Sequence, residues 1–191
     1  LYHAVTSLQH RGQDAASMIT SDQVQVYLRK GNGLVRDVIR DQHMQRLQGC
    51  MGLGHVRYPT AGGSSSTEAQ PLYVNSPYGL SMVHNGSLIN DRELAGQLRS
   101  HDLRHLNTRS DSEVLLNGFA HELQKHGRAK FSTAALFAAA TALYQRVQGA
   151  FAAVIMIHGH GLLALRDQHG IRPLAYGSKP SASTQAHQQS Y

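Results

Sequence analysis

The sequence predicts a single domain of the α+β class, for three reasons. Its 191 residues, 41% of them hydrophobic, are enough to form one buried core. Strand-like alternation fills the first third of the chain, helical spacing dominates residues 90–147, and strand patterns return after residue 149. This order of strands, helices and strands favours α+β layers over alternating βαβ units.

The first third of the chain predicts a short helix followed by three strands. Val5 and Leu8 lie at helical spacing before Gly12, which predicts the end of a helix. Strands are predicted over 15–20, 23–30 and 50–58, with a short helical segment over 43–47. Residues 60–68 are small and polar, which predicts a loop, and such loops often lie beside ligands.

The remaining elements follow from capping signals and apolar patterns. Asn90-x-x-Glu93 and Ser110-x-x-Glu113 fit the capping box that opens a helix. Helices are predicted over 90–100, 110–125 and 133–147, and strands over 78–84, 149–157 and 161–167. The segment after Gly177 has no apolar period, which predicts a disordered tail over 178–191.

Composition and charge exclude several classes of function. The 18 Lys and Arg residues outnumber 12 Asp and Glu residues, but they are scattered, which favours a solvated basic face over nucleic-acid binding. No apolar stretch approaches the roughly 20 residues that cross a bilayer, and no secretory signal opens the sequence. The single cysteine cannot form an internal disulfide, which fits a reducing compartment, so we expect a cytosolic protein. From the scattered charges and the short apolar stretches, we expect no nucleic-acid partner and no membrane partner.

The thirteen histidines do not predict a metal site. His121 and His126 lie five residues apart, about 140° round a helix, where a helical zinc pair is four apart. His158 and His160 fall at a predicted turn with no cysteine or carboxylate nearby. We therefore expect no metal, and the glycines between residues 49 and 54 match no phosphate-binding motif.

Three separate motifs together offer what the capture of a free amino acid requires. Arg57 at a strand end and Asp111 at a helix start are, singly, ordinary surface residues. Asn85-Gly86 alone predicts a hairpin turn, and with Ser87 it matches a glycosylation pattern of secreted proteins. As a set, they supply a guanidinium fork for a carboxylate, an acid for an ammonium group and amide donors for a carbonyl oxygen.

Several runs of residues resemble the amidophosphoribosyltransferase family, in the order of that family and at similar spacing. They are QHRGQDAA from Gln9, GHVRYPTAG from Gly54, HNG from His84, SDSE from Ser110, and Arg166-Asp167 followed by GIRPL from Gly170. The resemblance covers residues 1–177, which we expect to form the family's N-terminal class II glutamine amidotransferase domain. It implies the Ntn-hydrolase fold, a four-layer αββα sandwich with two antiparallel sheets between helices.

The resemblance also implies an activity and its partners. The family makes phosphoribosylamine from L-glutamine and phosphoribosyl pyrophosphate, the first committed step of purine synthesis. The N-terminal domain hydrolyses glutamine, and the ammonia passes through an internal channel to a phosphoribosyltransferase domain, which this sequence lacks. We therefore expect no cofactor in this chain, Mg²⁺ only with the phosphoribosyltransferase domain, and a homo-oligomer for the complete enzyme.

The family's substrate-binding residues carry over by motif. Arg57 would hold the α-carboxylate of glutamine, and Asp111 would bind its α-ammonium group. Tyr58 and Thr60 would line the same pocket.

The resemblance also assigns the residues around the reacting amide. The side-chain amide of Asn85 and the backbone N–H of Gly86 would form an oxyanion hole, where losing one donor costs about 100- to 1000-fold in rate. Arg11 and Gly12 would position the family's nucleophile, an N-terminal cysteine whose own α-amine acts as the base. That cysteine would lie a little over a dozen residues before Leu1.

Two further expectations concern the missing nucleophile. Cys50 has no free α-amine and begins a predicted strand, so we expect a buried structural thiol there rather than a substitute. The alternative to glutamine hydrolysis is that the chain is catalytically inactive and serves as a glutamine-binding or scaffold protein.

Overall fold

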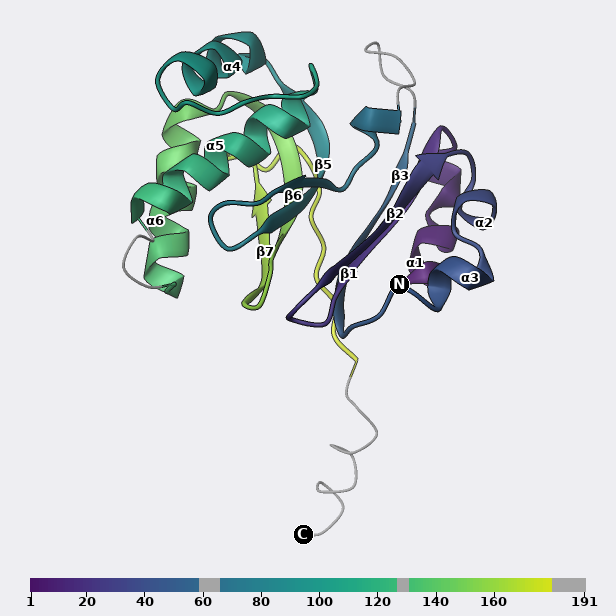
Figure 1. The fold of residues 1–191 in the computed structure, drawn as a ribbon. Coiled ribbons are helices and arrows are strands. Elements are labelled where there is room, and N and C mark those ends of the chain that lie inside the picture. The colour runs from purple at the N-terminus through teal and green to yellow at the C-terminus, as the bar shows by residue number, and fades with distance from the viewer. Residues whose placement is uncertain (59–65, 127–130, 180–191) are drawn as a thin grey trace, which may run out of the picture.

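The structure is a computed structural model that describes residues 1–58, 66–126 and 131–179. Helices and strands lie in four layers, in the order helix, sheet, sheet, helix (Figure 1). Every strand pair in both sheets is antiparallel. The predicted α+β class and the αββα arrangement are therefore confirmed.

The first sheet has the strand order β2-β1-β3, and the second has the order β4-β5-β6-β7. Their strands are β1 (Ala15–Ser21), β2 (Val26–Asn32), β3 (Met51–Arg57), β4 (Leu72–Val74), β5 (Leu80–Leu88), β6 (Gly149–Ile157) and β7 (Gly161–Arg166). The helices on the first sheet are α1 (Tyr2–Ser7), α2 (Val35–Val38) and α3 (Asp41–Met44), and those on the second are α4 (Asp91–Ser100), α5 (Asp111–His126) and α6 (Thr133–Arg146) (Figure 1). Two short 3-10 helices, η1 (Gln9–Arg11) and η2 (Ser66–Glu68), complete the described elements.

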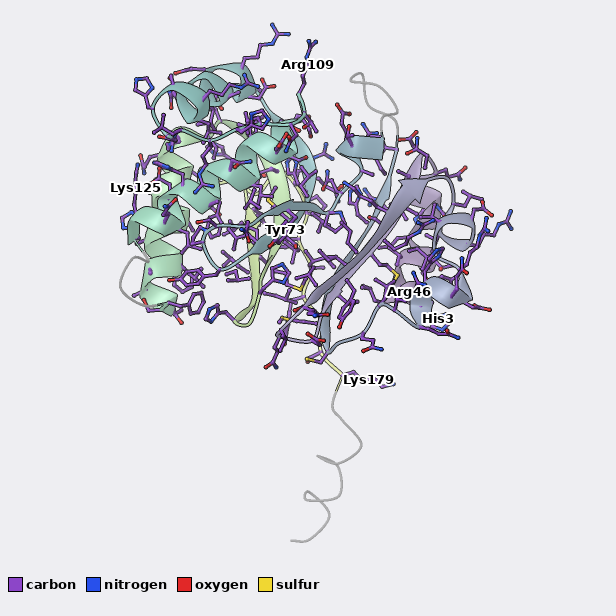
Figure 2. All side chains as sticks on the ribbon, viewed as in Figure 1. His3, Arg46, Tyr73, Arg109, Lys125 and Lys179 are labelled. Carbon is purple, nitrogen blue, oxygen red and sulfur yellow. The ribbon has the colours of Figure 1, made fainter. Side chains whose placement is uncertain are left out.

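Three apolar cores fill the spaces between the four layers. The largest lies between the second sheet and its helices, where Met82 of β5 and Phe119 of α5 are fully buried. Met18 of β1 belongs to a smaller core under α1 and α2, whereas its neighbour Ile19 belongs to a third core with Met156, between the sheets. Successive residues of a strand point to opposite faces, so β1 is buried on both sides. Side chains accordingly occupy the space between the two sheets (Figure 2).

The predicted elements are confirmed with shifted bounds, and four short elements were missed, namely α2, β4, η1 and η2. The predicted strand over 23–30 forms later, as β2, and the helical segment over 43–47 forms earlier, as α3. Strand β4 has only three residues, which is too short for a pattern of alternation, and α2 has only four. The predicted tail over 178–191 lies outside the described residues from residue 180 onward.

Neither predicted motif forms the reciprocal side-chain bonds of a capping box, although Ser110 does cap α5, because its Oγ accepts the N–H of Ser112 at 3.3 Å. The Asn90 side chain donates to the carbonyl oxygen of Arg146 and accepts from the N–H of Gln148, which ties the start of α4 to the α6–β6 connection. The Glu113 carboxylate accepts from N–H groups in the preceding loop, including that of Thr108 at 2.6 Å. Both helices nevertheless begin where the motifs predict.

A nearly buried ion-pair network joins the three helices on the second sheet. The Arg146 guanidinium on α6 donates to Asp102, just after α4, and to Glu122 on α5, each at 2.7 Å. His121 also contacts Asp102 at 3.2 Å, and Lys125 contacts Glu122 at 3.4 Å from a more exposed position. The network fixes α5, whose first residue faces the candidate site.

Candidate active site

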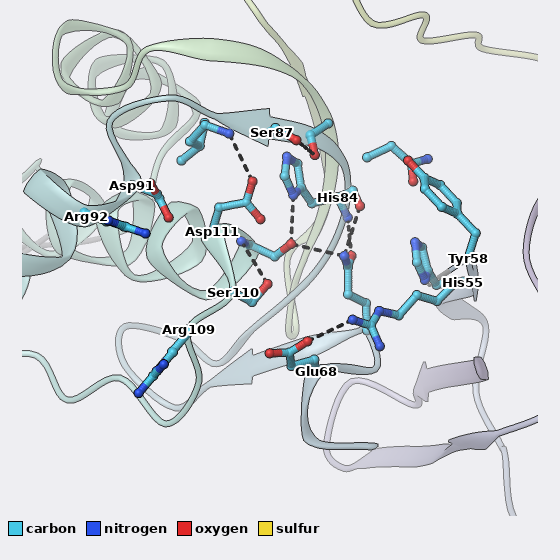
Figure 3. Close-up of a pocket in the computed structure, with 16 residues that line it drawn as sticks. His55, Tyr58, Glu68, His84, Ser87, Asp91, Arg92, Arg109, Ser110 and Asp111 are labelled. Carbon is cyan, nitrogen blue, oxygen red and sulfur yellow. Dashed lines mark hydrogen bonds and ion pairs between the residues drawn. The ribbon is translucent and has the colours of Figure 1, made fainter. Parts of the chain in front are cut away.

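A cavity of about 690 Å³ opens where the end of β3, strand β5 and the start of α5 meet (Figure 3). Five residues that the sequence selected line it together: Arg57, Tyr58, Asn85, Gly86 and Asp111. They come from three elements that are far apart in the sequence. The fold therefore brings the proposed carboxylate, carbonyl and ammonium contacts to one place.

Asp111 reaches the cavity as the first residue of α5. One oxygen of its carboxylate accepts the backbone N–H of Leu88, at the end of β5, at 3.0 Å. A carboxylate at a helix N-terminus is stabilised by the helix dipole. This contact fixes the position of the Asp111 carboxylate relative to β5, which carries the Asn-Gly pair.

Asn85 and Gly86 lie inside β5, opposite Ala152 and Phe151 of β6, so the predicted hairpin turn is wrong. Gly86 has φ +139°, and a Cβ there would lie 2.1 Å from the carbonyl oxygen of Ala150. Only glycine fits this backbone, because both the dihedral angle and the close approach exclude a side chain. The pattern that resembles a turn instead marks a distorted strand beside the cavity.

Arg57 is 7% exposed, and its guanidinium already binds two carboxylates. Nη1 donates to Asp14 at 3.1 Å, and Nη2 donates to Glu68 at 2.8 Å. Glu68 lines the cavity, whereas Asp14, just before β1, is not among the lining residues. The sequence analysis identified the guanidinium but missed these two carboxylates.

The residues predicted to position a nucleophile lie next to the cavity rather than in it. Arg11 lines a second cavity of about 170 Å³, together with Tyr58, Asn85 and Pro173. A Cβ on Gly12 would lie 2.6 Å from the backbone carbon of Arg57, so a side chain there would displace the strand end that carries the guanidinium. The predicted pocket residue Thr60 lies outside the described residues.

Gln70 is a buried hub that the sequence analysis missed. Its side-chain amide accepts the N–H of His84 at 2.5 Å and donates to the carbonyl oxygen of His84 at 3.0 Å. It also donates to Ser112 Oγ at 3.1 Å, and its backbone carbonyl accepts a hydrogen bond from Ser17 of β1. In the register that pairs Leu72 with Met82, residue 70 falls opposite residue 84, so the amide continues the β4–β5 pairing. The hub thus connects the first sheet, β5 and α5 next to the site.

Two histidines beside the Asn-Gly pair are held neutral by burial. Burial lowers the pKa of His55 to about 4, although an interaction with the Asn85 side chain opposes the shift. Burial also lowers the pKa of His84, against the attraction of Asp111, and the nearby Arg172 lowers it further. His84 Nδ1 shares a 2.8 Å hydrogen bond with Ser112 Oγ. Neutral imidazoles add no positive charge near the proposed oxyanion donors.

Asp167 holds the turn that brings Arg172 toward the site. Its carboxylate accepts the backbone N–H groups of Phe151, His169, Ile171 and Arg172 at 2.9–3.2 Å. These hydrogen bonds, that of Arg172 foremost, lower the pKa of Asp167 to about 2. The RD and GIRPL runs quoted above therefore form one local structure.

Cys50 is exposed, so the predicted buried thiol is wrong. The residue precedes Met51, where β3 begins, and therefore lies outside the sheet. Among residues 1–58, 66–126 and 131–179, no group of three His, Cys, Asp or Glu side chains could hold a metal ion. Within the same ranges, no helix has the length and apolar character needed to cross a membrane.

Comparisons with known proteins show the family of the chain. Residues 55–187 match the family model described as a glutamine amidotransferase domain. The amidophosphoribosyltransferases of Pseudomonas aeruginosa and Escherichia coli are 55% and 56% identical over 179 and 180 residues, which are 94% of this chain and 36% of each relative. The amidophosphoribosyltransferase of Methanocaldococcus jannaschii is 37% identical over 95% of this chain and 37% of its own length.

Two solved structures share the fold. The allosteric regulatory enzyme of purine biosynthesis matches with a TM-score of 0.75 at 33% identity, covering 90% of this chain and 35% of that protein. The glutamine phosphoribosylpyrophosphate amidotransferase from B. subtilis, complexed with ADP and GMP, matches with a TM-score of 0.73 at 30% identity, with the same coverage. The predicted Ntn-hydrolase fold is thereby confirmed, and the chain spans about a third of the length of these proteins.

Proposed function

Because this chain belongs to the glutamine amidotransferase domain family, we propose that it binds L-glutamine and hydrolyses the side-chain amide to release ammonia. The observation that carries the proposal is the convergence of Arg57, Asn85, Gly86 and Asp111 on one cavity. These groups match the charges and the reacting carbonyl of a single free amino acid.

The α-amino and α-carboxylate groups of glutamine bind at opposite charges. The Arg57 guanidinium takes the carboxylate, because its planar fork matches the two carboxylate oxygens. The Asp111 carboxylate takes the ammonium group, while its contact with Leu88 keeps it in place. Tyr58 lines the same pocket, and the family resemblance adds Thr60 to it. The fixed α-groups direct the side-chain amide toward β5.

Asn85 and Gly86 stabilise the negative charge that develops on the amide oxygen. Attack of a cysteine thiolate on the amide carbon forms a tetrahedral intermediate, whose collapse breaks the C–N bond and expels ammonia. Water then hydrolyses the thioester to glutamate. The family resemblance assigns the attack to an N-terminal cysteine, which is not among the residues of this sequence, and assigns its positioning to Arg11 and Gly12.

A glutamine titration of this chain tests the binding step. We expect L-glutamine to raise the melting temperature, because a ligand that binds only the folded state stabilises it by mass action. Arg57→Ala and Asp111→Asn should each abolish the shift, whereas Asp41→Asn, on a distant exposed helix, should retain it. No shift at millimolar glutamine in the folded wild-type chain would contradict the proposal.

Ammonia release separates the proposed function from the inactive alternative. The assay uses a chimera in which a cysteine-initiated segment of the family precedes Leu1, and it measures glutamate and ammonia formed from glutamine. Release that Asn85→Ala lowers about 100- to 1000-fold supports hydrolysis with an oxyanion hole. Glutamine binding without release from the chimera would favour a binding or scaffold protein.

The proposal extends to the whole protein of which such a domain forms part. The identities to amidophosphoribosyltransferases over 94% of the chain support a role in supplying ammonia for phosphoribosylamine synthesis from phosphoribosyl pyrophosphate. That second reaction, with its Mg²⁺, belongs to a phosphoribosyltransferase domain, and the complete enzyme is expected to be a cytosolic homo-oligomer.

A further inference from the structure

Glu68 contacts Arg57 from the side of the cavity. A dashed line in Figure 3 marks this ion pair, which starts at the labelled Glu68. The side chains of Glu68 and Arg57 are 15% and 9% exposed, and the Nη2–Oε2 distance is 2.8 Å. Asp14 binds the other terminal nitrogen, but it is not among the residues that line the cavity. Of the two carboxylates on the guanidinium, only that of Glu68 therefore lies where a ligand in the cavity would meet Arg57.

The charges around this contact oppose the simple addition of another carboxylate. Two carboxylates already face one guanidinium at positions with little solvent, and like charges interact strongly where water is scarce. The proposed ligand would bring a third negative group to the same guanidinium. Binding is more favourable when one carboxylate leaves as the other arrives.

We propose that Glu68 is an affinity-determining residue for glutamine, because its carboxylate occupies the place on Arg57 that the α-carboxylate of the ligand takes. Binding is thus an exchange of one carboxylate for another on the same guanidinium. The inference rests on the proposed function and adds to it a competing group within the protein. Asp14 has the opposite role, since it holds the guanidinium from outside the cavity and stays in place.

If binding is such an exchange, the effect of Glu68 on the Kd should depend on whether the ligand has an α-carboxylate. A ligand with an α-carboxylate can replace the Glu68 carboxylate in kind, with charge-assisted hydrogen bonds of equal type. A glutamine derivative with an α-carboxamide offers only a neutral partner and cannot compete with Glu68. Neutralising Glu68 should therefore favour the carboxylate ligand selectively.

Isothermal titration of this chain with L-glutamine and with its α-carboxamide tests the inference. For Glu68→Gln we expect the Kd for glutamine to fall about tenfold, which corresponds to about 1.4 kcal/mol, and little change for the carboxamide. Asp14→Asn should raise the Kd for glutamine. Glu93→Gln, the same change on the exposed face of α4, should leave the Kd within about twofold. Glu68→Ala serves as a second variant, and thermal unfolding of each variant verifies that it is folded.

The outcomes distinguish this inference from the proposed function. A tighter Kd for both Glu68 variants, confined to the carboxylate ligand, supports the exchange. Binding by the wild type that the Glu68 variants leave unchanged or weaken would overturn the role of Glu68 alone. A folded wild type and folded variants that all fail to bind glutamine would overturn the proposed function and, with it, this inference.

Discussion

Replacing Gln70 with leucine should destabilise the fold far more than the loss of one surface amide. The side chain is 9% exposed and pairs with both backbone groups of His84. Leucine has a similar volume but no polar atom, so the N–H and carbonyl of His84 lose these partners. A buried polar group left without a partner costs about 1–3 kcal/mol, which gives about 2–6 kcal/mol for the two. Ser112 Oγ retains its hydrogen bond to His84 Nδ1 and adds little.

Urea unfolding, followed by circular dichroism, measures this cost. With an m value of about 2 kcal/mol/M, a loss of about 4 kcal/mol lowers the midpoint by about 2 M. The matched control is Gln97→Leu, because Gln97 makes one exposed hydrogen bond to Glu93 on the same helix, and its change should stay within about 0.5 kcal/mol. Equal midpoints for the two variants would refute the argument that Gln70 completes the pairing of β5.

Three other perturbations follow from the structure. Arg146→Met removes the cation between two nearly buried carboxylates, and it should lower the free energy of unfolding in urea by about 3–5 kcal/mol. The control Lys125→Met should lower it by less than about 1 kcal/mol, and similar losses for the two variants would contradict the role of the network. Gly86→Ala should lower the free energy of unfolding by about 2 kcal/mol or more and weaken glutamine binding. At Gly96 in α4 an added Cβ meets no atom within 4 Å, so Gly96→Ala should raise the free energy of unfolding by about 0.5–1 kcal/mol in the same assay. Burial holds the pKa of His55 at about 4, below its usual 6.5, so its contribution to stability is complete above pH 6.5 and is lost as the pH falls toward 4. The free energy of unfolding in urea should fall by about 2–3 kcal/mol at pH 4.5, and a His55→Asn variant with the same acid loss would contradict this assignment.

The α+β class and most elements could be predicted from the sequence because period and order report them directly, whereas the four-layer arrangement followed from the family resemblance. The helices after residue 90 and the β6–β7 pair appear where apolar spacing predicts them. The Asn85-Gly86 pair could not be placed by its local preference, because pairing with β6 overrides a turn propensity that acts only over two residues. Likewise, Asn90 and Glu93 have the types of a capping box, but the side chain of Asn90 is used by a segment almost sixty residues away.

The site could be predicted as a set of groups but not as a set of interactions. Arg57, Asn85 and Asp111 each have a chemistry that is evident in the sequence, and the fold brings them to one cavity. Glu68 and Gln70 carry no such signal, because a glutamate and a glutamine after a polar loop are ordinary there. Their roles depend on the crossing of the first sheet over the second, which no local pattern encodes.

The division of the site between two sheets has a consequence for substrate length. The proposed carboxylate contact belongs to the first sheet, through Arg57, and the oxyanion donors Asn85 and Gly86 belong to the second. Packed sheets lie about 10 Å apart, at a distance set by the side chains between them, here including Ile19 and Met156. In the proposed complex, this spacing sets the length of amino acid that can reach both contacts at once. Glutamine is one methylene longer than asparagine, and one methylene changes the free energy of transition-state binding by about 1–3 kcal/mol. A change in the volume of the core between the sheets would then change the selectivity for glutamine over asparagine, although this core contacts neither substrate.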